Sequence, residues 1–223
     1  MTMGEMIELT ASCGHKFQAY LAGDAKATRG LVVVQEIFGV NGHMRRVCDE
    51  LAGHGYQVVS PALFDRVERG VELGYTDEDI QRGLKLREKI SEDEVVRDIE
   101  AAAAKLAPRP TGIIGYCWGG SVAWLGATKS KSFKAAIGWY GGGIAASREA
   151  QPNCPVELHF GAEDKGIPLE DVEKIRASHP DMPVHVYDGA GHGFGCEERP
   201  SYNPHATEIA LHRSLAFFAE HLV

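Results

Sequence analysis

Cys117 is the residue whose surroundings most clearly suggest chemistry. It lies in Gly-Tyr-Cys-Trp-Gly, between Gly115 and Gly119, after a short apolar run and before a segment rich in alanine and leucine. This pattern predicts a sharp strand-to-helix turn, in which the residues two before and two after a nucleophile must be small. Such a turn exposes the nucleophile at a helix N-terminus, where the helix dipole favours the reactive thiolate. A buried structural cysteine is the alternative, because cysteine is among the most often buried residues.

Two further residues could activate that thiol. Asp164 and His192 each follow an apolar, strand-like run, and His192 stands in a glycine-rich loop. Cysteine, acid and histidine thus appear in the order nucleophile, acid, base that α/β-hydrolases use. We expect His192 to take the thiol proton and later to protonate the leaving oxygen, while Asp164 orients the imidazole. Glu163 is the rival for the acid, and Asp188 is a weaker one because it comes a strand later.

The loop that follows the apolar run 31–35 could stabilise an oxyanion. It reads Glu36-Ile-Phe-Gly, and a loop at this place supplies one N–H to the oxyanion formed during acyl transfer. The backbone N–H groups of Ile37 and Trp118 are therefore the expected donors. A carboxylate at Glu36 beside a thiolate would be repelled, so its placement suggests control over the protonation of the thiol. A helix-preceding cap is the alternative role for Glu36.

The elements that must position these residues alternate along the chain. Apolar runs typical of buried strands cover residues 31–35, 57–60, 112–115, 135–140, 156–160 and 184–187, preceded by two short strands at 6–9 and 16–22. Helix-length segments cover 42–53, 77–90, 91–106, 119–128, 169–178 and 204–221, and Ser91 with Glu94 has the pattern of a capping box. The alternation predicts an α/β fold with a mostly parallel central sheet flanked by helices on both faces. Ligands of such sheets bind beyond the carboxyl ends of the strands.

Length and composition narrow the class of protein further. The 223 residues, without a repeat or linker, predict one domain over residues 1–223. A net charge of −8 lacks the basic footprint of a nucleic-acid binder, and no run reaches the roughly 18 apolar residues of a membrane span. The five cysteines are scattered without paired motifs, which argues against disulfides and a metal site and favours the reducing cytoplasm. We expect a small-molecule substrate, no metal and no cofactor; the oligomeric state stays open.

Several stretches resemble the dienelactone hydrolases, also called carboxymethylenebutenolidases. The similar stretches are Gln-Glu-Ile-Phe-Gly-Val-Asn at 35–41, Met-Arg at 44–45, Gly-Tyr-Cys-Trp-Gly-Gly at 115–120 and Ala-Gly-His-Gly-Phe at 190–194, and the likeness extends over nearly the whole chain. The resemblance implies an α/β-hydrolase fold without a large cap and a triad of Cys117, His192 and Asp164. It also implies an acyl-enzyme on Cys117 that water hydrolyses without a cofactor.

The same resemblance gives Glu36 the role of a switch. In the family the resting cysteine is kept as a thiol by its contact with the glutamate, and substrate binding moves the glutamate to take the thiol's proton. The family also places an arginine near this glutamate, and Arg82 is the matching position in this sequence.

The expected substrate pocket departs from the family's pattern. The serine and arginine that follow the catalytic histidine in the family are here Gly193 and Cys196, and the tyrosine expected shortly after Arg82 is absent. Arg199 or Arg87 could replace the missing arginine. The residues expected to line the pocket are Phe38, Tyr140, Phe194 and Arg199.

The sequence therefore predicts a carboxylic ester hydrolase that acts on small lactones or esters in the manner of a dienelactone hydrolase. The segment 66–76 is too short to form a large cap, which favours small, open substrates. A broader carboxylesterase or thioesterase on the same fold is the first alternative. A non-catalytic binding module is the second, and loss of a triad residue would favour it, yet all three are present.

Overall fold

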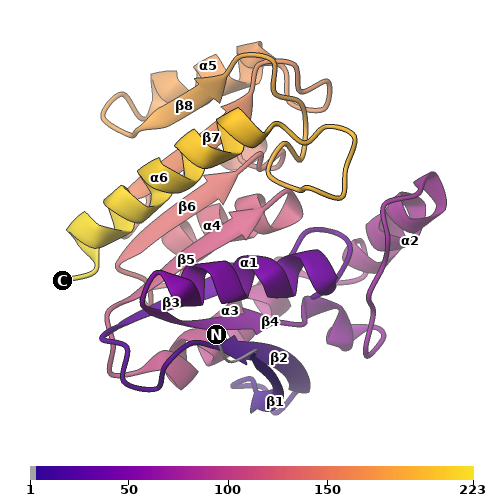
Figure 1. The fold of residues 1–223 in the computed structure, drawn as a ribbon, viewed down its shortest axis with the longest axis vertical. Coiled ribbons are helices and arrows are strands. Elements are labelled where there is room, and N and C mark those ends of the chain that lie inside the picture. Colours follow the sequence, from indigo (N-terminus) through magenta and orange to yellow (C-terminus); the bar gives the residue numbers. More distant parts are fainter. Residues whose placement is uncertain (1–3) are drawn as a thin grey trace.

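The computed structural model describes residues 4–223 and contains an eight-stranded sheet (Figure 1). Its strands lie in the spatial order β1-β2-β4-β3-β5-β6-β7-β8. The pairs β1–β2 and β2–β4 are antiparallel, and every later pair is parallel. The strands are β1 (Glu5–Thr10), β2 (Lys16–Ala22), β3 (Arg29–Val34), β4 (Tyr56–Pro61), β5 (Thr111–Tyr116), β6 (Ala135–Trp139), β7 (Val156–Gly161) and β8 (Val184–Tyr187).

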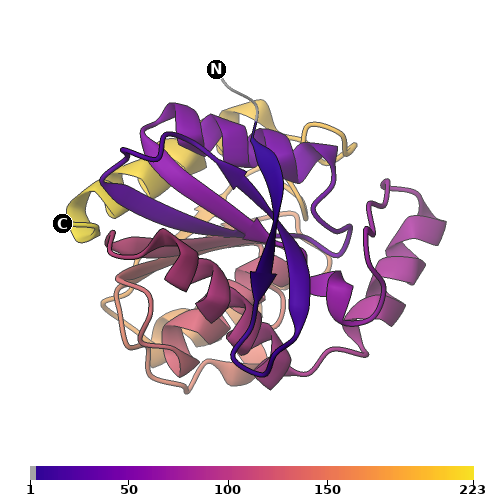
Figure 2. The same cartoon turned by 90° about the horizontal axis from the view of Figure 1, so that it is seen from below.

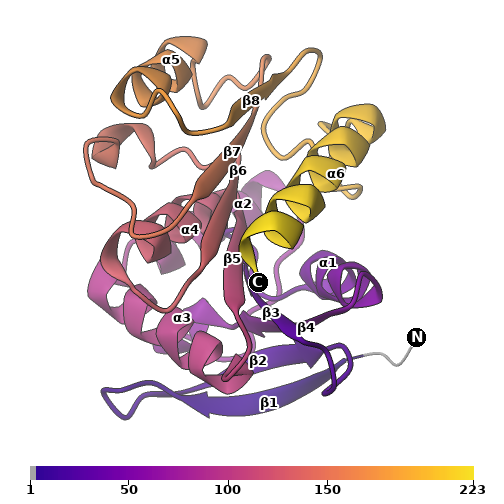
Figure 3. The same ribbon diagram turned by 90° about the vertical axis from the view of Figure 1, so that its left-hand side faces the viewer.

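Helices cover both faces of this sheet. Figure 3 shows α1 and α6 on one side and α3, α4 and α5 on the other, while α2 stands beside the layered body (Figures 1 and 2). The helices are α1 (Gly42–Gly53), α2 (Asp77–Arg87), α3 (Glu92–Leu106), α4 (Trp118–Lys129), α5 (Leu169–Ser178) and α6 (Pro204–His221), with 3-10 turns η1 (Leu63–Arg66) and η2 (Ala145–Ser147). Helices on both faces explain why every residue of β4, β5, β6 and β7 is buried and why these strands read as continuous apolar runs.

A short segment between η1 and α2 closes over the loop that follows β3. Asn41 caps α1 by accepting the N–H of Met44, and its amide also donates to the Leu73 carbonyl at 3.0 Å and to the Tyr75 hydroxyl at 3.1 Å. The Leu73 N–H in turn donates to the Phe38 carbonyl at 2.9 Å. These bonds hold the segment against the loop, and it contains no helix that could form a cap over the carboxyl ends of the strands.

The predicted fold class is confirmed, and each expected strand and helix is present with small differences at its ends. The capping box at Ser91 and Glu94 is also confirmed. Helix α2 ends at Arg87 and not at residue 90, because the N–H groups of Lys89 and Ile90 donate to carbonyls three residues back and tighten the chain into a turn. No helix within residues 4–223 has the length and apolar character needed to cross a membrane.

Candidate active site

Cys117 occupies the turn between β5 and α4. Its φ of 56° is one that L-residues seldom adopt, and its N–H donates to the Trp139 carbonyl at 3.0 Å. Two glycines let the turn close. A Cβ on Gly115 would lie 1.9 Å from the carbonyl oxygen of Gly119, and one on Gly119 would lie 2.3 Å from the carbonyl oxygen of Val34. The sequence pattern around Cys117 thus forms the sharp turn that a nucleophile elbow requires.

The thiol, the imidazole and a carboxylate lie in hydrogen-bonding contact. Nε2 of His192 is 3.1 Å from Sγ of Cys117, and Nδ1 of His192 is 2.7 Å from Oδ2 of Asp164. The other oxygen, Oδ1, accepts the backbone N–H groups of Gly166 and Ile167 at 2.8 and 3.1 Å. Because an ionised carboxylate only accepts hydrogen bonds, Nδ1 carries the proton and Nε2 faces the thiol.

The structure distinguishes Asp164 from its two rivals. Asp164 is buried in contact with His192, whereas Glu163 and Asp188 are both exposed. The carboxylate that the structure brings into contact with His192 is therefore that of Asp164.

The surroundings of His192 favour proton transfer from the thiol. Burial opposes protonation of the imidazole, but its hydrogen bonds to Asp164 and Cys117 outweigh burial and raise the pKa of His192 to about 10. The ring of Tyr140 also packs edge-on against the imidazole, with centroids 5.4 Å apart. A strongly basic imidazole 3.1 Å from the Cys117 sulfur is placed to accept the thiol proton.

A cavity of about 410 Å³ opens beside Cys117. Cys117, His192, Ile37 and Trp118 all contribute to its wall. Trp118 is the first residue of α4, so its backbone N–H belongs to the first-turn donors that have no partner within the helix. The two residues expected to donate to the oxyanion therefore line the same cavity as Cys117.

The rest of the cavity wall combines an apolar surface with two cations. Phe38, Ile80 and Leu84 supply the apolar part, and Arg87 and Arg199 supply the cations. The guanidinium of Arg199 lies over the ring of Phe38, 5.8 Å from its centroid. Phe38 and Arg199 thus line the pocket as the sequence predicted, and the wall suits a small apolar body that carries an anionic group.

Tyr140 and Phe194 were also predicted to line the substrate pocket, but both lie behind the cavity wall, so this part of the prediction is wrong. Tyr140 and Phe194 are both fully buried and pack edge-on, with centroids 5.2 Å apart. The ring of Tyr140 packs edge-on against His192, and Phe194 packs against Tyr140. Neither residue belongs to the wall of the cavity beside Cys117.

Glu36 lies fully buried directly after β3, in the loop that carries Ile37. Neither of its carboxylate oxygens has a hydrogen-bond partner among the described residues. The nearest cation is Arg199, whose Nη1 lies 3.7 Å from Oε1, too far for a hydrogen bond. Burial raises the pKa of Glu36, and the charges of Arg199 and His192 oppose that shift. In this structure the Cys117 thiol contacts His192.

Arg82 is not placed beside Glu36, and this expectation is wrong. Its guanidinium is exposed and pairs with Glu68, with Nη2 2.6 Å from Oε1. The reason lies in the next residue. A Cβ on Gly83 would lie 2.1 Å from the carbonyl oxygen of Ile37, so α2 packs on the loop through Gly83 and turns the neighbouring Arg82 outward. The cation that approaches Glu36 is Arg199.

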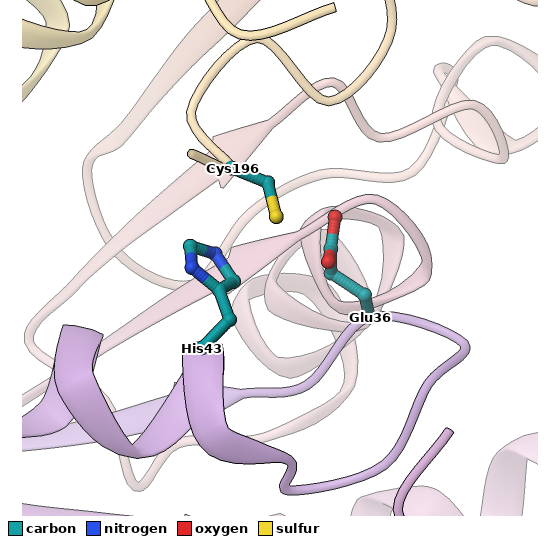
Figure 4. Close-up of side chains that lie close together, drawn as sticks. All are labelled: Glu36, His43 and Cys196. Carbon is teal, nitrogen blue, oxygen red and sulfur yellow. The ribbon is translucent and has the colours of Figure 1, made fainter. Parts of the chain in front are cut away.

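Two residues next to Glu36 were not anticipated as functional. His43, in the first turn of α1, and Cys196, in the loop after β8, point toward the Glu36 carboxylate (Figure 4). One ligating atom from each of the three lies within 4.8 Å of the others. No sequence signal could have revealed this group, because a short metal-binding motif is absent and only the folded loops bring the three side chains together.

The comparisons with known proteins show which family the chain belongs to. The model of the dienelactone hydrolase family matches residues 17–222. The chain belongs to the dienelactone hydrolase family. A member named carboxymethylenebutenolidase, from Pseudomonas putida, is 33% identical over 227 residues, with 96% of each chain covered.

Solved structures of related folds give the same result. A crystal structure named "Putative Dienelactone Hydrolase", from Klebsiella pneumoniae, superposes with a TM-score of 0.81 at 29% identity and covers 97% of this chain and 99% of that one. The Pyrococcus furiosus esterase Pf2001, at 16% identity and a TM-score of 0.71 with 99% and 93% covered, shows the shared α/β-hydrolase fold. As a member of the dienelactone hydrolase family, the chain is a hydrolase of ester or lactone bonds.

Proposed function

We propose that this family member hydrolyses small lactones or esters through an acyl-enzyme on Cys117, with His192 as the base and Asp164 as its orienting acid. The observation that supports the proposal is the chain of contacts from Sγ to Nε2 at 3.1 Å and from Nδ1 to Oδ2 at 2.7 Å. We place these steps in one catalytic domain over the whole chain, and in a reducing compartment such as the cytoplasm, where a nucleophilic thiol persists.

The reaction would proceed in two balanced steps. The Cys117 thiolate attacks the carbonyl carbon, and the N–H groups of Ile37 and Trp118 stabilise the oxyanion. The tetrahedral intermediate collapses to a thioester, and the His192 imidazolium gives its proton to the leaving oxygen. His192 then takes a proton from water, whose oxygen attacks the thioester, and the thiolate leaves with the acid as product. A lactone would keep its leaving oxygen tethered to the acyl group.

The cations of the cavity wall suggest that the substrate carries a carboxylate. Arg199 lines the cavity beside Cys117 and also lies 3.7 Å from the buried Glu36. A substrate carboxylate that engages Arg199 would weaken its attraction for Glu36. The glutamate would then accept the thiol proton in place of His192, and His192, whose pKa of about 10 makes it an imidazolium beforehand, would supply the proton for the leaving oxygen. Ionisation of Cys117 would then depend on the arrival of substrate.

Trapping the acyl-enzyme tests the central step. Rapid mixing with an activated aryl ester followed by mass spectrometry should show one acyl group on the wild-type chain and none on Cys117→Ala. Hydrolysis by Cys117→Ala within about tenfold of the wild-type rate would contradict the proposal, because removal of a catalytic nucleophile ordinarily costs several orders of magnitude. The same result would favour the alternative that the protein is a non-catalytic binding module.

A broader carboxylesterase or thioesterase activity is the second candidate. It is favoured by the apolar wall formed by Phe38, Ile80 and Leu84 and by Gly193 and Cys196, which replace the serine and arginine expected from the family pattern. A panel of lactones and esters with and without a free carboxylate, compared by kcat/KM, separates the two candidates. Equal values across the panel would select the broader esterase.

A further inference from the structure

Three buried side chains converge behind the wall of the active site. Glu36 extends from the loop after β3, His43 from α1 and Cys196 from the loop after β8, and their carboxylate, imidazole and thiol point toward one another (Figure 4). Within this group, called the Glu36–His43–Cys196 cluster, one ligating atom of each residue lies within 4.8 Å of the others.

Two of the three side chains have polar atoms without protein partners, whereas the Cys196 thiol contacts the Tyr75 hydroxyl and the Glu198 backbone. Both carboxylate oxygens of Glu36 and Nε2 of His43 have no hydrogen bond to any described residue. Glu36 and Cys196 are completely buried, and His43 is 4% exposed. Buried polar atoms in proteins are nearly always paired, so three unpaired atoms that face one another indicate a ligand that the protein itself does not supply.

The chemistry of the donors identifies the class of that ligand. Thiolate sulfur, imidazole nitrogen and carboxylate oxygen are the three kinds of atom that bind Zn²⁺, and in catalytic zinc sites three protein ligands leave a fourth position open. One thiolate and one carboxylate would neutralise a divalent cation. Ligating atoms of a tetrahedral zinc site lie roughly 3.5 Å apart, so the cluster needs only small side-chain movements to reach that geometry.

We propose that Glu36, His43 and Cys196 bind one zinc-class divalent cation, which inhibits hydrolysis by holding Glu36 in place. Binding forms three bonds to the ion and releases the Cys196 thiol proton to water, with no change in oxidation state. Arg199 lines the active-site cavity and approaches Glu36 at 3.7 Å, so displacement of its side chain opens a path from that cavity to the cluster.

A second group of acid and histidine side chains in the protein does not meet these conditions. Glu157 already contacts His159 and His185, and Nδ1 of His159 lies 2.8 Å from the hydroxyl of Tyr187. Its polar atoms are satisfied within the protein, and no thiol takes part. Cys117 with His192 is a possible competing site for a soft ion, so a test must remove that thiol.

Cobalt(II) titration tests binding without reference to activity. In Cys117→Ala, Co²⁺ should bind at one equivalent and produce thiolate-to-cobalt charge-transfer absorption, and Zn²⁺ should displace it. The added substitution Cys196→Ser should abolish that absorption, whereas Cys154→Ser, a matched change at a half-buried thiol elsewhere, should leave it intact. His43→Gln should weaken binding by about 100-fold or more. Loss of a residue that only orients a metal ligand costs about 10- to 100-fold, so a loss at or above the top of that range indicates a direct ligand.

The inhibitory part of the zinc proposal rests on the proposed function. The following outcomes separate failure of the metal site from failure of the hydrolase function. Zn²⁺ should lower ester hydrolysis by the wild type about tenfold or more, a chelator should restore it, and Cys196→Ser should resist the ion. Absence of the cobalt absorption in Cys117→Ala, or its survival after Cys196→Ser, overturns the metal site. Equal inhibition of wild type and Cys196→Ser overturns the inhibitory role. A wild type without hydrolase activity would refute the proposed function, while the cobalt spectra would still decide the site.

Discussion

Glu157 and Glu36 are both buried glutamates, one within a strand of the sheet and one just beyond the end of a strand, but their surroundings differ. Glu157 lies within β7, and its oxygens lie 3.0 Å from Nε2 of His159 and 3.4 Å from Nε2 of His185. Burial alone would raise the pKa of Glu157, but these hydrogen bonds lower it to about 2. Glu36 lies beyond the end of β3, has no hydrogen bond among the described residues, and has a raised pKa because it is buried.

The difference indicates that the Glu157 carboxylate stabilises the fold, whereas the Glu36 carboxylate stays unpaired and available for chemistry. The bonds of Glu157 fix its charge and position, and each offsets the cost of burial. No protein hydrogen bond offsets the cost of burying Glu36, and destabilised groups of this kind are typical of functional sites. Position in the sheet explains the contrast, because the carboxyl ends of parallel strands are where α/β proteins bind ligands.

The largest effect is expected from Asp164, a third buried carboxylate that is fully bonded yet stands at the functional edge. In Asp164→Asn the amide N–H would donate to Nδ1 of His192, so the ring proton would move to Nε2 and block acceptance of the thiol proton. We expect kcat to fall about 10³-fold or more. Steady-state kinetics would measure it, with Glu163→Gln as the exposed control. A loss below about tenfold would remove Asp164 from the triad.

The same substitution at the two glutamates tests the comparison directly. Glu36→Gln should lower kcat about 100-fold, because a proton-accepting group is lost, and should leave the free energy of unfolding nearly unchanged. Glu157→Gln should leave kcat within about twofold and destabilise the fold by about 1–3 kcal/mol, because a buried acceptor becomes a donor. Kinetics and urea unfolding of both variants give the answer. The comparison fails if the two effects are reversed.

A smaller effect is expected at the cation beside Glu36. Arg199→Ala should lower kcat/KM for carboxylate-bearing esters about tenfold, since a charge-assisted contact is lost, and should spare neutral esters. Arg82→Ala, which removes an exposed partner of Glu68, is the matched control and should change neither class by more than about twofold. Equal losses on charged and neutral esters would exclude a role for Arg199 in anion recognition.

The smallest effect concerns the pH dependence of stability. The pKa of Glu157 in the folded chain, about 2, is below the ordinary value of about 4.3, so its stabilisation is present above pH 4.3 and lost as pH falls toward 2. The free energy of unfolding of wild type should therefore exceed that of Glu157→Gln by about 1–3 kcal/mol near pH 6, and the gap should narrow near pH 3. A gap independent of pH would show that Glu157 is not bonded as a carboxylate.

The sequence predicted those features that depend on local pattern. Gly115 and Gly119 identified the turn at Cys117, and the runs before Asp164 and His192 placed both at strand ends, where the structure brings them into contact. The ends of strands and helices also followed from local signals, as at Ser91. Parallel strands carry their carboxyl ends to one edge, so chain order was enough to predict which residues gather there.

The features that the sequence did not predict depend on the direction of side chains. Arg82 was expected beside Glu36, but the contact of Gly83 with the β3 loop turns it outward. Tyr140 packs against His192 and does not line the cavity, which its residue type does not reveal. Cys196 meets Glu36 only through the path of a long loop. Such outcomes are set by packing between elements far apart in the chain, and no local periodicity encodes them.

The bonds made by Asn41 bear on how the substrate range of such a hydrolase can be altered. Its amide, with the Leu73-to-Phe38 bond, ties the segment 67–76 to the loop after β3, while the proposed triad comes from the loops after β5, β7 and β8. Two side-chain bonds from Asn41 and one backbone bond thus help to hold a segment that contributes no residue to the wall of the cavity beside Cys117. Insertions there could build a lid and re-engineer selectivity, because no catalytic residue belongs to that stretch of chain.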